Sequence, residues 1–267
     1  MTGLKSLSFE NILSNFLPTS FNNYWFLTTY IVFSLFIPSV NKLIANMSKK
    51  DFSIFVLILV FVFSTWSLIT LNKFTSFTNG GLLAQFLMYY SVGAYIRKYP
   101  NSNLKKYRFV ILFGSITILV LSVLICDFIG LSSHSGYFYV RGSVVVVLLS
   151  ASLVQIAVCA KPIYNRLISS LGVATLGVYL IHDHPFVREW LWKDLFNNTD
   201  YVTSPKMLIH FTICTLSVFI ICLIIDWLRN LVFGNIEKSI LSKLQEIIIN
   251  FFCFVKKIFQ FSYEKNV

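Results

Sequence analysis

The run His182-Asp183-His184-Pro185 holds the densest set of side chains that could take part in chemistry. A histidine can accept or donate a proton near neutral pH, and an adjacent carboxylate can fix which ring nitrogen carries the proton. His182 and Asp183 are therefore weak candidates for catalysis. A structural role is the alternative, in which His182 satisfies the end of a packed helix.

We predict no metal site in this run. His182 and His184 are two residues apart, so they do not share a helix face. A zinc-type site needs at least a third protein ligand, and the rest of the sequence offers no obvious His or Cys for that position. The five cysteines lie inside apolar stretches without a paired spacing, which is typical of small buried side chains.

The composition decides which kind of fold must position these residues. Of the 267 residues, 56% are hydrophobic and only 12% are charged, and the mean hydropathy is +0.73. A soluble protein could not cover so many apolar side chains, because its surface needs polar groups. The composition argues against a cytosolic enzyme, a disordered chain and a nucleic-acid-binding protein. It predicts an all-α fold, a polytopic bundle of transmembrane helices.

Seven apolar segments are predicted to cross the membrane. A spanning helix needs about 20 residues, and most of the segments approach that length. The third and sixth are short, and the sixth contains Gly172 and Gly177 and stops at His182. The predicted spans are 24–44, 52–71, 81–96, 109–131, 140–160, 168–182 and 207–227.

The basic residues predict the orientation of these spans. With an external start, 16 of the 22 Lys and Arg residues fall in inner loops and the tail, and six fall outside. The positive-inside rule therefore places the N-terminus outside and the C-terminus in the cytoplasm, in a plasma-membrane protein. The predicted regions are an external segment (1–23), a transmembrane domain (24–231) and a cytoplasmic amphipathic tail (232–267).

The tail has its own helical pattern. Within 236–261, apolar residues recur at spacings of three and four, and charged residues interrupt them. Such a helix is predicted to lie on the inner leaflet in contact with membrane lipids. A helix that caps the bundle is an equally open alternative.

Three short motifs together resemble the integral-membrane acyltransferase family 3, over about residues 24–226. Their order and spacing carry the resemblance, and the residues are Tyr24-Trp25-Phe26-Leu27 with Tyr30, Pro38 and Asn41, then Gly93-Ala94-Tyr95-Ile96-Arg97, then Gly177-Val178-Tyr179-Leu180-Ile181-His182. The resemblance implies an acyltransferase acting on groups other than aminoacyl. It implies acetyl-CoA as the acyl donor and a hydroxyl of a surface polysaccharide or related carbohydrate as the acceptor.

The resemblance and the topology together predict where the carbohydrate binds. The predicted orientation places Tyr24 and Trp25 at the same outer interface as His182. Tyr24, Trp25, Tyr179 and His182 are therefore predicted to bind a sugar through aromatic stacking and hydrogen bonds. For Tyr24 and Trp25 the alternative is an aromatic belt that anchors the first span at the interface.

One feature of the family has no counterpart in the sequence. The family's first helix carries an arginine or lysine followed by a histidine tied to catalysis, and no such helix precedes Tyr24. The chain is therefore expected to be the C-terminal part of an acyltransferase, inactive alone, with the missing N-terminal helices as a partner chain. None of the remaining histidines is assigned the family's catalytic role.

A non-enzymatic transporter or polysaccharide export component is the main alternative. The sequence of such a protein would be expected to contain inverted repeats or several paired charges at mid-membrane. The sequence shows neither feature.

Overall fold

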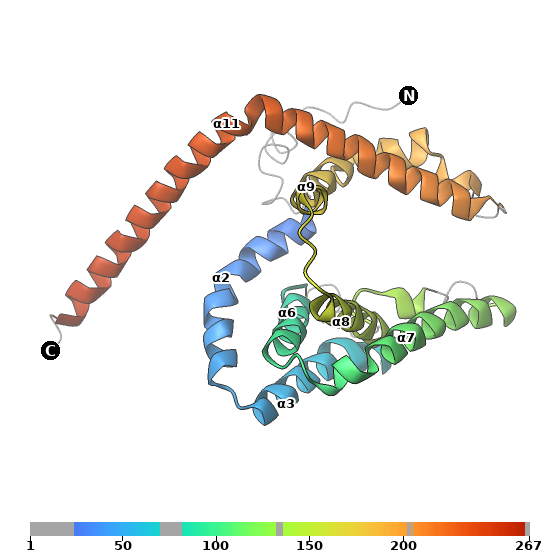
Figure 1. Cartoon of the computed structure of the whole chain (residues 1–267), viewed down its shortest axis with the longest axis horizontal. Coiled ribbons are helices and arrows are strands. Elements are labelled where there is room, and N and C mark those ends of the chain that lie inside the picture. Colours follow the sequence, from blue (N-terminus) through green and yellow to red (C-terminus); the bar gives the residue numbers. More distant parts are fainter. Residues whose placement is uncertain (1–23, 70–81, 132–135, 202–203, 205, 265–267) are drawn as a thin grey trace. The chain divides into compact units, whose positions relative to one another are not determined.

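The computed structural model describes residues 24–69, 82–131, 136–201, 204 and 206–264 (Figure 1). Its elements are all helices, and the described residues contain no β-strand. The predicted all-α class is confirmed for this part of the chain. The chain forms two compact units, residues 1–163 (unit 1) and 164–267 (unit 2). The predicted external segment, 1–23, lies outside the described residues.

Unit 1 is arranged around α6 (Leu82–Lys98), which contacts three α-helices and the π-helix η1. A buried cluster of Leu59, Met88 and Val147 joins three of these elements. The remaining helices are α2 (Trp25–Asn46), α3 (Lys49–Val60), η1 (Phe61–Thr65), α4 (Trp66–Ile69), α7 (Asn103–Phe128), η3 (Tyr137–Tyr139) and α8 (Val144–Cys159). Of these, α2, α3 and α8 contact α6, and α7 packs along α8. The elements α3, η1 and α4 follow one another directly, so the described part of the second predicted span, 52–69, is one continuous helix with a π-helical segment inside it.

At one end of unit 1, polar side chains tie the helix ends together. The Lys98 ammonium donates to the carbonyl oxygens of Ile44, at 2.8 Å, and Met47, at 3.3 Å. A cation is favourable there because the last carbonyls of a helix carry partial negative charge. The Gln155 amide donates to the Pro100 carbonyl at 3.3 Å, which adds the end of α8. The ends of α2, α6 and α8 therefore meet the starts of α3 and α7.

Unit 2 consists of two long helices and the short helices that connect them. Its elements are α9 (Arg166–His182), α10 (Pro185–Glu189), η4 (Trp190–Leu195), η5 (Asn198–Tyr201) and α11 (Met207–Glu264). Val178 of α9 and Leu191 of η4 join Val218 and Cys222 of α11 in one buried cluster. The helices α9 and α11 also meet at Gly177, where the α9 backbone lies against the Asp226 carboxylate.

The structure confirms that the chain has apolar helices long enough to cross a membrane, and it does not test the predicted number of seven. Three helices of the described residues are long and apolar enough to cross a membrane, and Val144–Cys159 and Ile168–His182 are shorter apolar helices. The three are Trp25–Asn46, Asn103–Phe128 and Ile209–Ile247. Large apolar side chains are exposed along them, such as Leu35 at 72% and Val110 at 70%. Such a surface is suited to lipid. The count of seven spans remains a prediction.

The predicted tail segment is helical, and it continues the helix of the seventh predicted span without a break. α11 runs without interruption from Met207 to Glu264, so it includes both the seventh predicted span and the segment 236–261. Figure 1 shows that α11 changes direction along its length. Arg229 forms an ion pair with Asp226 at 3.0 Å and a second with Glu237 further along the helix. These pairs join residues on either side of the predicted boundary at 231.

Candidate functional site

The helix α9 ends where the sequence predicts, at His182. The next two residues are not helical, and Pro185 is the first residue of α10. Proline disfavours the helical conformation in the residue before it, and His184 has an extended ψ of 131°. The break between α9 and α10 therefore follows directly from the sequence His182-Asp183-His184-Pro185.

The His182 ring is oriented by its own helix. The Nδ1 atom lies 2.7 Å from the carbonyl oxygen of Val178, one turn earlier. A carbonyl can only accept a hydrogen bond, so in the neutral imidazole Nδ1 carries the proton and Nε2 has a free lone pair. In this tautomer, Nε2 can accept a hydrogen bond from a hydroxyl group.

Asp183 lies directly beside His182 and is mostly buried. Its side chain is 16% exposed, and its Oδ1 atom pairs with Arg188 of α10 at 3.3 Å. The Oδ2 atom is buried and has no hydrogen-bond partner among the described residues. An oxygen of this kind can accept a hydrogen bond from a ligand, because a buried carboxylate is costly when it is not fully satisfied.

Two of the four predicted sugar-binding residues come together in unit 2. The rings of Tyr179 and His182 lie edge to face, with their centroids 6.3 Å apart. Together with Asp183 they form a small polar group at the end of α9, which we call the α9 site. Tyr24 and Trp25 belong to unit 1. A single site that includes all four predicted residues therefore remains a prediction.

In unit 1, the first predicted span has a contact that the sequence analysis missed. The Arg141 guanidinium carbon lies 4.0 Å from the centroid of the Trp25 ring, whereas Tyr24 is buried and 6% exposed. From the sequence, Arg141 is one of the six external basic residues and lies near the start of the fifth predicted span. The aromatic residues Tyr137, Phe138 and Tyr139 just before it gave no indication that Trp25 is its partner.

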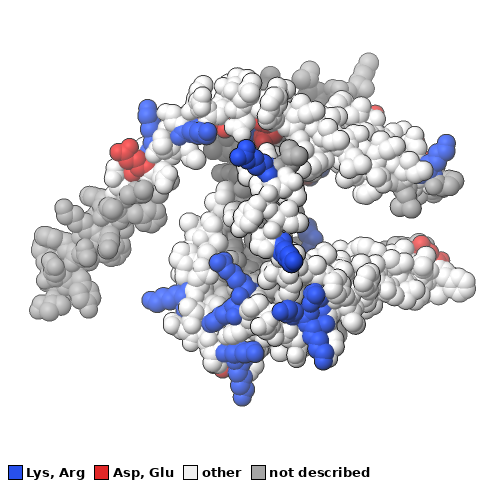
Figure 2. Space-filling model, in the orientation of Figure 1, with Lys and Arg blue, Asp and Glu red and all other residues white. Residues whose placement is uncertain are grey.

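Basic side chains collect at the end of unit 1 where α2 and α6 end and α3 and α7 begin (Figure 2). The ammonium groups of Lys49 and Lys98 lie 5.6 and 5.8 Å from the centroid of the Tyr99 ring. Asp51 is the one acidic residue in these segments. We call this surface the basic end, and its cations are Lys42, Lys49, Lys50, Arg97, Lys98, Lys105, Lys106 and Arg108.

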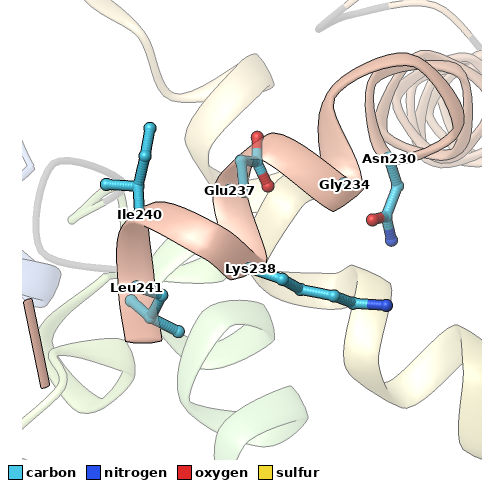
Figure 3. A pocket seen from close by; sticks show the side chains of 6 residues that line it. All are labelled: Asn230, Gly234, Glu237, Lys238, Ile240 and Leu241. Atoms are coloured by element: carbon cyan, nitrogen blue, oxygen red, sulfur yellow. The ribbon is translucent and has the colours of Figure 1, made fainter. Parts of the chain in front are cut away.

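The described residues do not support a metal site, and the pocket along α11 does not have the features of a ligand site. Within the described residues, no three or more His, Cys, Asp or Glu side chains are grouped so as to hold a metal ion. A pocket of about 410 Å³ lies along α11, and Figure 3 shows that its six lining residues all belong to that helix. Its polar groups do not converge from several elements, which a ligand site normally requires.

The apolar helices and their exposed apolar surface define a helical membrane protein. The family model described as an acyltransferase domain, that of the acyltransferase 3 family, matches residues 3–227. The chain therefore belongs to this family, as the motif resemblance predicts. Comparison with curated proteins found no match, and comparison with solved structures found none either.

Proposed function

We propose that the protein is a membrane-bound O-acyltransferase. It transfers an acetyl or other short acyl group from acyl-CoA to a hydroxyl of a surface polysaccharide or related carbohydrate. The match of the acyltransferase family over residues 3–227 carries this proposal. The protein works in the plasma membrane, with its N-terminus outside and its C-terminus in the cytoplasm.

The basic end supports a role in holding the acyl donor. Acetyl-CoA carries several phosphate groups and an adenine ring on its nucleotide portion, far from the acyl group. Lysine and arginine bind phosphate oxygens, and an aromatic ring such as Tyr99 can stack against a base. In the proposed orientation this surface faces the cytoplasm, where acyl-CoA is available.

The α9 site supports a role in holding the acceptor. His182 Nε2 accepts a hydrogen bond from the acceptor hydroxyl and so orients the hydroxyl oxygen. In the overall reaction, this oxygen bonds to the acyl carbon, the carbon–sulfur bond of the thioester breaks, and the hydroxyl proton leaves with the coenzyme A thiolate. Tyr179 and Asp183 surround the acceptor with further hydrogen-bonding groups.

The proposal is tested in cells that express the intact gene and in cells from which it is deleted. We expect the surface glycan of the first cells to carry O-acetyl groups, measured by NMR of the isolated glycan, and that of the deletion cells to lack them. The total amount of surface glycan should be equal in both. A deletion that removes the glycan itself from the surface, with no change in acetylation per sugar, would support the export alternative instead.

The proposed orientation makes a separate prediction. In a background whose five cysteines are replaced by serine, a membrane-impermeant maleimide should label Thr199→Cys in intact cells. It should label Asn103→Cys only after permeabilisation. Both positions are exposed within their units, so accessibility depends on the side of the membrane. The cysteine-free chain controls for background, and the reverse labelling pattern would show that the orientation is wrong.

A further inference from the structure

Arg141 is held at the end of unit 1 where α2, α6 and α8 begin. Its guanidinium carbon lies 4.0 Å from the centroid of the Trp25 ring, which is a close cation–π contact. Its carbonyl oxygen accepts a hydrogen bond from the Tyr89 hydroxyl at 2.5 Å. The side chain and the backbone of Arg141 are therefore both fixed, by residues of two other helices.

The adjacent loop lies unusually close to the helices behind it. An ideal Cβ atom built on Gly142 would be 3.0 Å from the Gln85 amide nitrogen and 3.4 Å from the Phe63 carbonyl oxygen. The next residue, Ser143, is buried and caps α8 through a hydrogen bond from the Val145 N–H. Phe63 belongs to the π-helix η1, and π-helical turns often occur at functional sites. The loop thus presents Arg141 from a well-packed base.

Arg141 has no acidic partner in the described part of the chain. The four ion pairs there do not include it. It is also the one Lys or Arg of the described part of unit 1 at this end, because the others lie at the basic end or beyond α8. The contact with the Trp25 ring is not a hydrogen bond, so it leaves the N–H groups of the guanidinium able to bind a ligand. These groups match the two oxygens of a carboxylate.

We propose that Arg141 binds a carboxylate group of the acceptor glycan, and that Trp25 is a positioning residue that orients the guanidinium. The acceptor class is therefore an acidic polysaccharide, such as one that contains uronic acid residues. This inference rests on the proposed function for the identity of the acceptor. It changes the predicted role of Trp25, which acts on the sugar through Arg141.

Direct binding tests the inference without any need for turnover. The full chain in phosphatidylcholine nanodiscs is titrated with a glucuronate-containing oligosaccharide and with the methyl ester of the same oligosaccharide. We expect the acid form to bind about tenfold more tightly or better, as for a hydrogen-bonded charge pair. Arg141→Gln should abolish this preference and Arg141→Lys should retain part of it. Lys161→Gln, which removes a charge beyond α8, should leave it unchanged.

The comparison of acid and ester in the native chain would overturn the inference by itself if both bind equally, or if neither binds. Loss of the preference when the nanodiscs contain phosphatidylglycerol would also overturn it, since Arg141 would then hold a lipid phosphate. Acid-selective binding without acyl transfer would contradict only the proposed function. Equal acetylation of acidic and neutral glycans, with Arg141→Gln fully active, would contradict only the inference.

Discussion

Replacing His182 with asparagine is expected to lower acyl transfer by about 100-fold or more, while the protein remains at normal abundance. A group that orients a reacting atom can contribute about 100-fold, because a small misplacement of that atom slows the reaction by this factor. The asparagine amide can take the place of Nδ1 and still donate to the Val178 carbonyl, which now accepts from the ring at 2.7 Å. It has no atom at the position of Nε2. The variant therefore removes the acceptor atom and keeps the structural bond.

A glutamine at the same position is the matched control. Its side chain is longer by one methylene group and brings an oxygen near the position of Nε2, but it gives up the bond to Val178. We expect His182→Gln to retain more turnover than His182→Asn and to lose some thermal stability. Acetylation of the glycan, divided by protein abundance from immunoblots, is the measurement. Unchanged turnover of His182→Asn at normal abundance would contradict the proposed role, and loss of abundance in both variants would indicate a structural one.

Much of the helical arrangement could be predicted from the sequence, because apolar runs and helix-breaking residues are local signals. The predicted span 168–182 ends at the same residue as α9, since Pro185 prevents continuation. The fourth predicted span begins at 109, and the helix that contains it, α7, begins earlier, at Asn103, and includes Lys105, Lys106 and Arg108. Hydropathy detects the apolar part of a helix, while the backbone continues into the polar interface.

Contacts between distant residues could not be predicted. The contact between Arg141 and Trp25 depends on how the loop before α8 packs against α2. The sequence around either residue does not indicate that the other is its partner. The segment 185–195, which lies between two predicted spans, is helical, and its Leu191 is buried together with Val218 and Cys222 of α11. The sequence of this segment does not indicate which helix buries Leu191.

The close contact between α9 and α11 at Asp226 depends on Gly177. An ideal Cβ atom built there would overlap the Asp226 carboxylate, with Oδ2 at 2.8 Å and the other carboxylate atoms nearer. Asp226 is 8% exposed and cannot easily move aside, because Oδ1 pairs with the Arg229 guanidinium at 3.0 Å. Small residues allow this close packing of membrane helices.

Gly177→Ala is therefore expected to destabilise unit 2 by about 1–3 kcal/mol, the usual cost of overpacking a well-packed contact. Gly172→Ala is the matched control in the same helix, since nothing lies within 4 Å of its Cβ position. That change should be neutral or stabilising by about 0.5–1 kcal/mol, because alanine favours helix over glycine. Thermal unfolding in detergent measures both. Adding Asp226→Ala to Gly177→Ala should recover part of the loss, since it removes the overlapping carboxylate. Equal stability of the Gly177→Ala and Gly172→Ala proteins would show that the two helices do not meet as closely as this structure has them.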